Sequence, residues 1–166
     1  LKIGLGHQAR VGKDTFADHI EDKYGCVRLN FAEPLYEIAE HIQRILGKPI
    51  IKDPTLLQFI GEGMRKIYGE NVFVDPVMTR VAEITSEDPS ANIIIPGMRY
   101  PNEMEKLISA GFITVKITRK NRPIDRDPNH ISETALRDAT FDFHIENDGT
   151  IDAFTQKIDE ILLARQ

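Results

Sequence analysis

The sequence has 166 residues and a formal net charge of −5, from 21 basic and 26 acidic residues, so we expect one domain, residues 1–166, with an apolar core. One cysteine excludes an internal disulfide and a cysteine-rich zinc site, and the acidic balance argues against a coat for nucleic-acid polymers. No apolar run approaches the ~20 residues that span a bilayer, so we expect a cytoplasmic protein without a membrane partner.

Strand-like runs alternate with helical periodicity along the chain. The patterns predict a strand at 2–6, a helix at 13–24, a strand at 26–31, helices at 33–46, 55–68 and 75–85, and a wholly apolar strand at 92–95. The rest of the chain predicts a helix at 102–110, a strand at 112–118, a charged loop at 120–129, a short helix near Glu133, a strand at 141–146 and an amphipathic helix from Ile151. This alternation predicts an α/β fold, in which about five parallel strands lie between two layers of helices.

The first strand leads through a glycine-containing loop into a helix, which is the setting of a phosphate-binding loop. Ligands of parallel sheets bind beyond the carboxyl ends of the strands, and backbone N–H groups there hold phosphates. The predicted ATP-binding residues of this loop are Gly6, His7, Gln8, Ala9, Arg10, Val11, Gly12, Lys13, Asp14 and Thr15. Lys13 is expected to reach the β- and γ-phosphates, and Asp14 and Thr15 are the candidate Mg²⁺ ligands. An ordinary strand-to-helix turn with an exposed lysine is the alternative.

Five short blocks follow one another over essentially the whole chain. They are residues 3–15, ending in A-R-V-G-K-D-T, residues 57–65 (L-Q-F-I-G-E-G-M-R), 99–103 (R-Y-P-N-E), 129–133 (N-H-I-S-E) and 141–149 (F-D, I at 145, then N-D-G). In this order they resemble the bacteriophage-type deoxynucleoside monophosphate kinases. The resemblance implies a P-loop kinase fold, ATP and Mg²⁺ as cofactors, and small nucleotides as partners. It also implies a helical acceptor-binding insert at about 33–85, a lid at about 119–137, and the host cytoplasm as location if a phage encodes the protein.

Two residues depart from the pattern of that family. His7 stands where the family usually has the first glycine of the loop, and a histidine is strained if that position needs a positive φ. Gly97 stands where the family often has an aspartate, which leaves Asp14 as the main candidate for Mg²⁺.

Three alternatives therefore stay open beside a deoxynucleoside monophosphate kinase. One is a P-loop kinase for another phosphorylated acceptor, of the dephospho-coenzyme A or phosphomevalonate type. The second is a nucleotide-binding protein with weakened catalysis, in which Gly97→Asp is expected to raise activity. The third is a purely structural α/β domain.

Phosphoryl transfer brings several negative charges together, so arginines are expected to converge on the site. Arg99, just past the central strand, and Arg65, on a helix of the insert, are placed to hold an acceptor phosphate, or else form surface ion pairs. Arg119, Arg122 and Arg126 crowd one loop, which suits either a lid over the phosphates or a solvated charged segment.

Further polar and aromatic residues complete the expected site. The predicted catalytic residues are Lys13, Arg99, Arg119, Arg122 and Arg126. Candidate acceptor-binding residues, besides Arg65 and Arg99, are Phe31, Glu33, Gln58, Glu103, His130 and Glu133, although a structural role is slightly favoured for Glu33, Gln58 and Glu103. Asn147 is a candidate for the donor base, and Ser132 is expected to cap a helix. With Arg10, seven of the 21 basic residues thus gather in a predicted cleft of an acidic protein, and a homodimer is left open.

Overall fold

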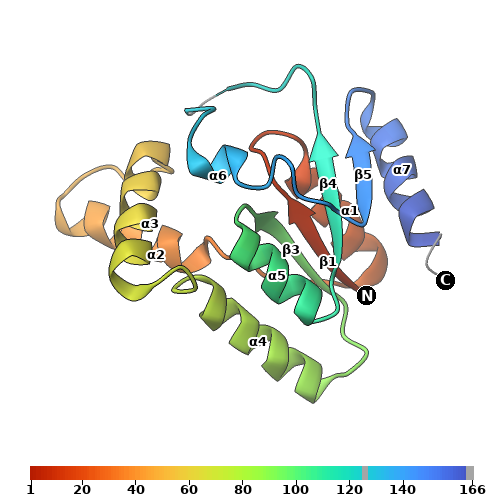
Figure 1. Ribbon diagram of the computed structural model, residues 1–166, viewed down its shortest axis with the longest axis horizontal. Coiled ribbons are helices and arrows are strands. Elements are labelled where there is room, and N and C mark those ends of the chain that lie inside the picture. The colour runs from red at the N-terminus through yellow and green to blue at the C-terminus, as the bar shows by residue number, and fades with distance from the viewer. Residues whose placement is uncertain (125–126, 164–166) are drawn as a thin grey trace.

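The computed structural model describes residues 1–124 and 127–163, and within them the chain forms one five-stranded sheet (Figure 1). The strands are β1 (Lys2–Gly6), β2 (Val27–Arg28), β3 (Ile93–Met98), β4 (Ile113–Thr118) and β5 (Phe143–Glu146). Their order is β2-β3-β1-β4-β5, and every neighbouring pair is parallel. The predicted sheet is therefore confirmed in both strand number and direction.

Helices cover both faces of this sheet. On one face lie α1 (Lys13–Tyr24) and α7 (Ile151–Leu163), and on the other lie α4 (Val74–Glu87) and α5 (Pro101–Ser109). The remaining helices are α2 (Glu33–Ile45), α3 (Pro54–Tyr68) and the short α6 (Ile131–Thr134). The three-layer αβα arrangement is confirmed. Among the described helices none is both long and apolar enough to cross a membrane.

The apolar run of β3 explains why this strand lies inside the sheet. Ile93, Ile94 and Ile95 are all fully buried. Ile94 packs in the core beneath α1 and α7, whereas Ile93 and Ile95 pack in the core beneath α4 and α5. Alternating side chains of one strand thus enter two cores, and a strand covered on both faces has no place for polar residues.

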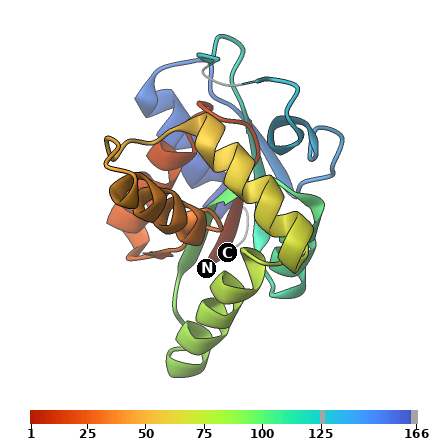
Figure 2. The same ribbon diagram turned by 90° about the vertical axis from the view of Figure 1, so that its left-hand side faces the viewer.

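Helices α2 and α3 have a small core of their own, formed by Leu35, Ala39, Ile60 and Phe73. Figure 2, seen from their side, shows the two helices in front of the sheet. The predicted insert at 33–85 contains these helices and α4, and its assignment as one acceptor-binding unit stays a prediction.

Four strands differ from their predicted bounds: β4 begins one residue later and β5 two residues later than predicted, and β2 and β3 differ further. β2 has only residues 27–28 instead of 26–31, because it lies at the edge of the sheet and the chain then turns at Asn30, whose Oδ1 accepts a hydrogen bond from Ala32 N at 3.0 Å. β3 runs on through Pro96 and Gly97 to Met98, with one extra residue relative to β1, since Gly4 pairs with Ile95 but Gly6 with Met98. The predicted bounds of the helices from α1 to α5 lie within two residues of those observed.

Candidate active site

The loop between β1 and α1 places a helix N-terminus at the carboxyl edge of the sheet. Gly12 has a φ of 104°, the left-handed conformation that favours glycine, and α1 begins at the next residue. The N–H groups of the first helical turn have no partners within the helix, so the loop can present them to an anion. The Lys13 side chain is almost buried, and its amine donates a hydrogen bond to the carbonyl oxygen of Gln8. We call residues 6–15 the phosphate loop.

His7 is not strained in the way that the sequence suggests. Among the described non-glycine residues only Arg10, with a φ of 60°, has a positive φ. The His7 ring is buried beside Phe141, with 6.4 Å between ring centroids, and its two nitrogens have no hydrogen-bond partner among the described residues. Burial, together with the charges of Lys116 and Lys13, lowers the pKa of His7 to about 4, so the imidazole is neutral at pH 7.

Asn147, which follows β5, supports the phosphate loop from outside. Its Nδ2 donates a hydrogen bond to the Val11 carbonyl oxygen at 2.9 Å. A Cβ added at Gly12 would lie 2.4 Å from the same Nδ2, so only glycine fits there. The structure thus places Asn147 against the loop backbone, where the sequence suggests contact with the donor base.

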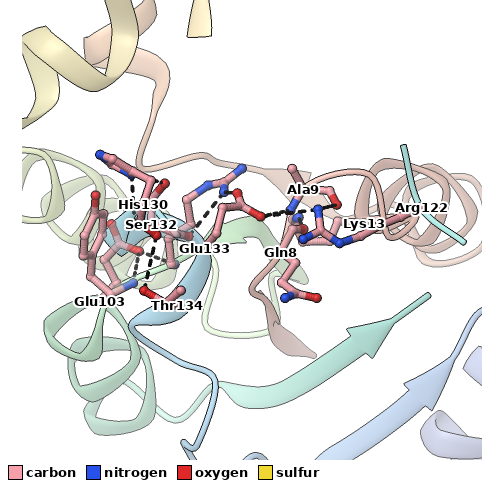
Figure 3. A network of polar contacts seen from close by, with 11 residues as sticks. Gln8, Ala9, Lys13, Glu103, Arg122, His130, Ser132, Glu133 and Thr134 are labelled. Atoms are coloured by element: carbon pink, nitrogen blue, oxygen red, sulfur yellow. Dashed lines mark hydrogen bonds and ion pairs between the residues drawn. The ribbon is translucent and has the colours of Figure 1, made fainter. Parts of the chain in front are cut away.

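A buried carboxylate joins the phosphate loop to two arginines (Figure 3). Glu133, on α6, has no exposed surface. Its Oε1 lies 2.7 Å from Nη1 of Arg99, and its Oε2 accepts a hydrogen bond from Ala9 N at 3.1 Å. Arg122 Nη1 lies 3.5 Å from the same Oε2 and donates to the Ala9 carbonyl oxygen at 3.1 Å. Residues from four separate segments therefore meet at one carboxylate.

Two neighbouring hollows lie at this edge of the sheet. The first, called the loop hollow, has a volume of about 410 Å³, and its lining includes Ala9, Arg10, Lys13, Asp14, Asn30, Gly97 and Arg99. The second, called the insert hollow, has a volume of about 80 Å³, and its lining includes Phe31, Tyr36, Gln58, Arg65, Arg99, Tyr100, Glu103 and His130. Arg99 lines both hollows, so one guanidinium lies where they adjoin.

The insert hollow combines aromatic rings with polar groups. The Arg65 guanidinium lies 4.2 Å from the centroid of the Tyr100 ring, and the buried Nε2 of Gln58 has no hydrogen-bond partner among the described residues. His130, which lines this hollow, has its Nε2 at 2.7 Å from Oε1 of Glu62 on α3.

Glu103 and His130 also organise the backbone at this edge. Glu103 Oε2 accepts hydrogen bonds from the backbone N–H groups of Arg99, at 2.6 Å, and Tyr100, at 3.1 Å. Burial raises the pKa of Glu103 to about 7, although these two N–H groups oppose the rise. His130, and not Ser132 as the sequence suggests, caps α6, because its ring nitrogen accepts from Ser132 N. Ser132 lies two residues after the cap position, within the first turn of α6.

Some predicted residues are not brought into the hollows. Glu33 is exposed at the start of α2 and lines neither hollow. Arg119 is exposed and makes no ion pair or hydrogen bond with the residues described. Arg126 lies outside the described residues. Sequence reasoning missed Asn30, Tyr36 and Tyr100. Asn30 lay within the predicted strand 26–31, so its position did not mark it as a site residue.

The residues beside the phosphate loop fit a magnesium ion held mainly by a nucleotide. The described residues contain no group of three or more His, Cys, Asp or Glu side chains that could hold a metal ion alone. Asp14 lines the loop hollow, Thr15 follows it in the chain, and Gly97 offers no side chain. Mg²⁺ prefers oxygen ligands and is typically bound by one or two carboxylates with phosphates and water, so the Asp14 carboxylate beside the loop hollow fits a metal ion whose other ligands come from phosphates and water.

Comparisons with known proteins establish the family of this chain. The sequence model of a family described as deoxynucleotide monophosphate kinase matches residues 57–158. The chain is 32% identical over 156 residues to "Uncharacterized protein ORF77" of Ictalurid herpesvirus 1 (strain Auburn), covering 91% of this chain and 65% of that protein's length. It is 25% identical over 181 residues to the protein named "Putative deoxynucleotide monophosphate kinase" of Acanthamoeba polyphaga mimivirus, covering 94% and 93%.

Among solved structures, shikimate kinase from Aquifex aeolicus is similar with a TM-score of 0.53 and 16% identity, covering 99% of this chain and 98% of that one. At this identity the similarity concerns the fold alone: the chain shares the fold of this shikimate kinase.

Proposed function

The chain belongs to the deoxynucleotide monophosphate kinase family, and on that premise we propose that it transfers the γ-phosphoryl group of ATP to a deoxynucleoside monophosphate. One observation carries the proposal: the loop hollow, with Lys13, adjoins the insert hollow, with Arg65, and Arg99 lines both. A donor phosphate chain in the first and an acceptor phosphate in the second would meet beside one guanidinium. Transfer between two anions needs such a charge at the meeting point.

The proposed reaction assigns a role to each side chain. An oxygen of the acceptor phosphate attacks the γ-phosphorus, the bond from that phosphorus to the β,γ-bridging oxygen breaks, and ADP and a deoxynucleoside diphosphate leave. No general base is needed, because the acceptor phosphate is already an anion. The phosphate loop and Lys13 hold the donor, Arg65 holds the acceptor, and Arg99 and Arg122 neutralise the migrating charge. Bound Mg²⁺ supplies further positive charge at the donor phosphates, held by Asp14 and Thr15.

The size of the insert hollow supports a movable acceptor site. Its volume of about 80 Å³ is below the roughly 300–1,000 Å³ of pockets that enclose small ligands. A nucleotide would therefore bind only after α3 moves away from α6, which breaks the contact between Glu62 and His130. We accordingly assign residues 33–85 to the acceptor-binding insert and 119–137 to the lid, with free nucleotides of the cytoplasmic pool as substrates.

An assay of ADP release tests this function. The purified chain is incubated with ATP, Mg²⁺ and each of the four common deoxynucleoside monophosphates at millimolar concentration. We expect turnover with at least one of them, and a loss of about 100-fold or more in Lys13→Ala. Lys106→Ala is the matched control, because Lys106 is exposed on α5 and lines neither hollow.

The same assay separates the alternatives. Turnover with none of the four acceptors refutes the proposal. Turnover with dephospho-coenzyme A or phosphomevalonate alone would move the assignment to another acceptor. ATP binding by calorimetry without any turnover would identify a nucleotide-binding protein instead.

A further inference from the structure

Glu133 is a carboxylate that the proposed reaction does not use. It has no exposed surface and belongs to the lining of neither hollow, so a substrate has no direct access to it. Burying a charged carboxylate is costly unless charges and hydrogen bonds compensate it. Both of its oxygens are compensated: Oε1 by Arg99 at 2.7 Å, and Oε2 by Ala9 N at 3.1 Å and Arg122 at 3.5 Å. Because both oxygens already have protein partners, the Glu133 carboxylate is not a ligand of the acceptor in the proposed reaction.

The partners of Glu133 are themselves parts of the proposed site. Ala9 is held on both of its backbone polar groups, because Glu133 accepts from its N–H and Arg122 donates to its carbonyl oxygen. Arg99 is held at the point where the two hollows adjoin. A long arginine side chain loses up to ~2 kcal/mol of rotamer freedom when it is fixed. A partner that fixes it before substrates bind removes that cost from the reaction.

We infer that Glu133 is a positioning residue, which holds the phosphate loop and the guanidinium groups of Arg99 and Arg122 in their working geometry before nucleotides bind. This inference rests on the proposed function for its effect on rate, but not for its effect on the free protein. Removing the carboxylate leaves both arginines charged and able to meet ground-state phosphates. The geometry required in the transition state is lost, so the loss is expected in kcat and not in KM.

Kinetics of isosteric and conservative variants test the effect on rate. In Glu133→Gln, which keeps an acceptor oxygen but no charge, we expect kcat to fall about 10–100-fold while both KM values stay within about 3-fold. Glu133→Asp keeps the charge on a shorter side chain and is expected to recover part of kcat. The matched control Glu105→Gln, on the exposed face of α5, should behave as the wild type. A rise in the acceptor KM of about 10-fold or more at unchanged kcat overturns the inference, because Glu133 would then bind substrate directly.

Amide hydrogen exchange in the nucleotide-free protein tests the same inference without any turnover. The Ala9 amide donates to Glu133, so Glu133→Ala should speed its exchange about 10-fold or more relative to amides of β1 in the same sample. Unchanged exchange at Ala9 overturns the inference even if the protein is an active kinase. Faster exchange in a protein that phosphorylates nothing supports the positioning while the proposed function fails. The two proposals can therefore fail separately.

Discussion

Gly97 gives the sharpest prediction, because the structure shows an obstacle to the aspartate that the sequence comparison suggests at this position. A Cβ at this position would lie 3.1 Å from Cγ of Asn30 and 2.4 Å from its Oδ1, and the second distance is shorter than Cβ atoms approach in folded proteins. Gly97→Asp therefore has to displace the Asn30 side chain, which gives up its 3.0 Å hydrogen bond from Ala32 N. Crowding costs about 1–3 kcal/mol and the lost hydrogen bond about 1 kcal/mol. Replacing glycine also lowers the conformational entropy of the unfolded chain, which stabilises the folded variant by up to ~1 kcal/mol.

The net expectation is a loss of about 1–3 kcal/mol in the free energy of unfolding. For a chain of this size that corresponds to a fall of about 2–12 °C in Tm. Urea and thermal unfolding of Gly97→Asp measure it directly. Gly63→Asp is the matched control, because no atom lies within 4 Å of a Cβ added at Gly63. This control should keep the wild-type Tm within about 2 °C.

The double variant Asn30→Ala/Gly97→Asp tests the cause of the loss. If Asn30 is the obstacle, the two changes are non-additive, and the double variant regains about 1 kcal/mol or more relative to the sum of the single changes. Unaltered stability of Gly97→Asp, or strict additivity, would refute the reasoning. Activity of the double variant then shows whether a carboxylate at position 97 improves catalysis, a question that the single substitution confounds with unfolding.

Two further predictions concern charged groups at the same edge. The pKa of His7 is about 4 in the folded chain and 6.5 without the fold, so the unfolded state alone takes up a proton as the pH falls through this window. The wild type therefore loses stability on acidification, and urea unfolding should show a smaller loss between pH 7 and pH 5 in His7→Gln, with His41→Gln as an exposed control. Equal losses in both variants would contradict this. Arg122→Ala should lower Tm by about 2–4 °C, because the variant loses the hydrogen bond from Arg122 to the Ala9 carbonyl oxygen. The control Arg119→Ala should leave Tm unchanged, because Arg119 is exposed. Equal Tm shifts in the two variants would show that the hydrogen bond to Ala9 does not stabilise the fold.

The sequence alone determined the architecture and indicated where the candidate site lies. Apolar periodicity marks each element locally, so the bounds of α1 and the inner position of β3 follow from neighbouring residues. A loop between a buried strand and a helix must lie at the carboxyl edge of a parallel sheet, which located the phosphate loop. The edge strand β2 was predicted too long, because its end depends on a turn made by the side chain of Asn30.

Only the tertiary structure decided which residues lie together at the candidate site. Ala9 and Glu133 are 124 residues apart in the chain, and no local pattern indicates their hydrogen bond. The same holds for the hydrogen bond from Asn147 to the Val11 carbonyl oxygen, 136 residues away, and for the close approach of the Asn30 side chain to Gly97. A motif specifies residue types and spacing, whereas a role depends on burial and on partners that arrive from other strands. Burial is what separates Glu133, which is enclosed by its partners, from Arg99, which faces both hollows.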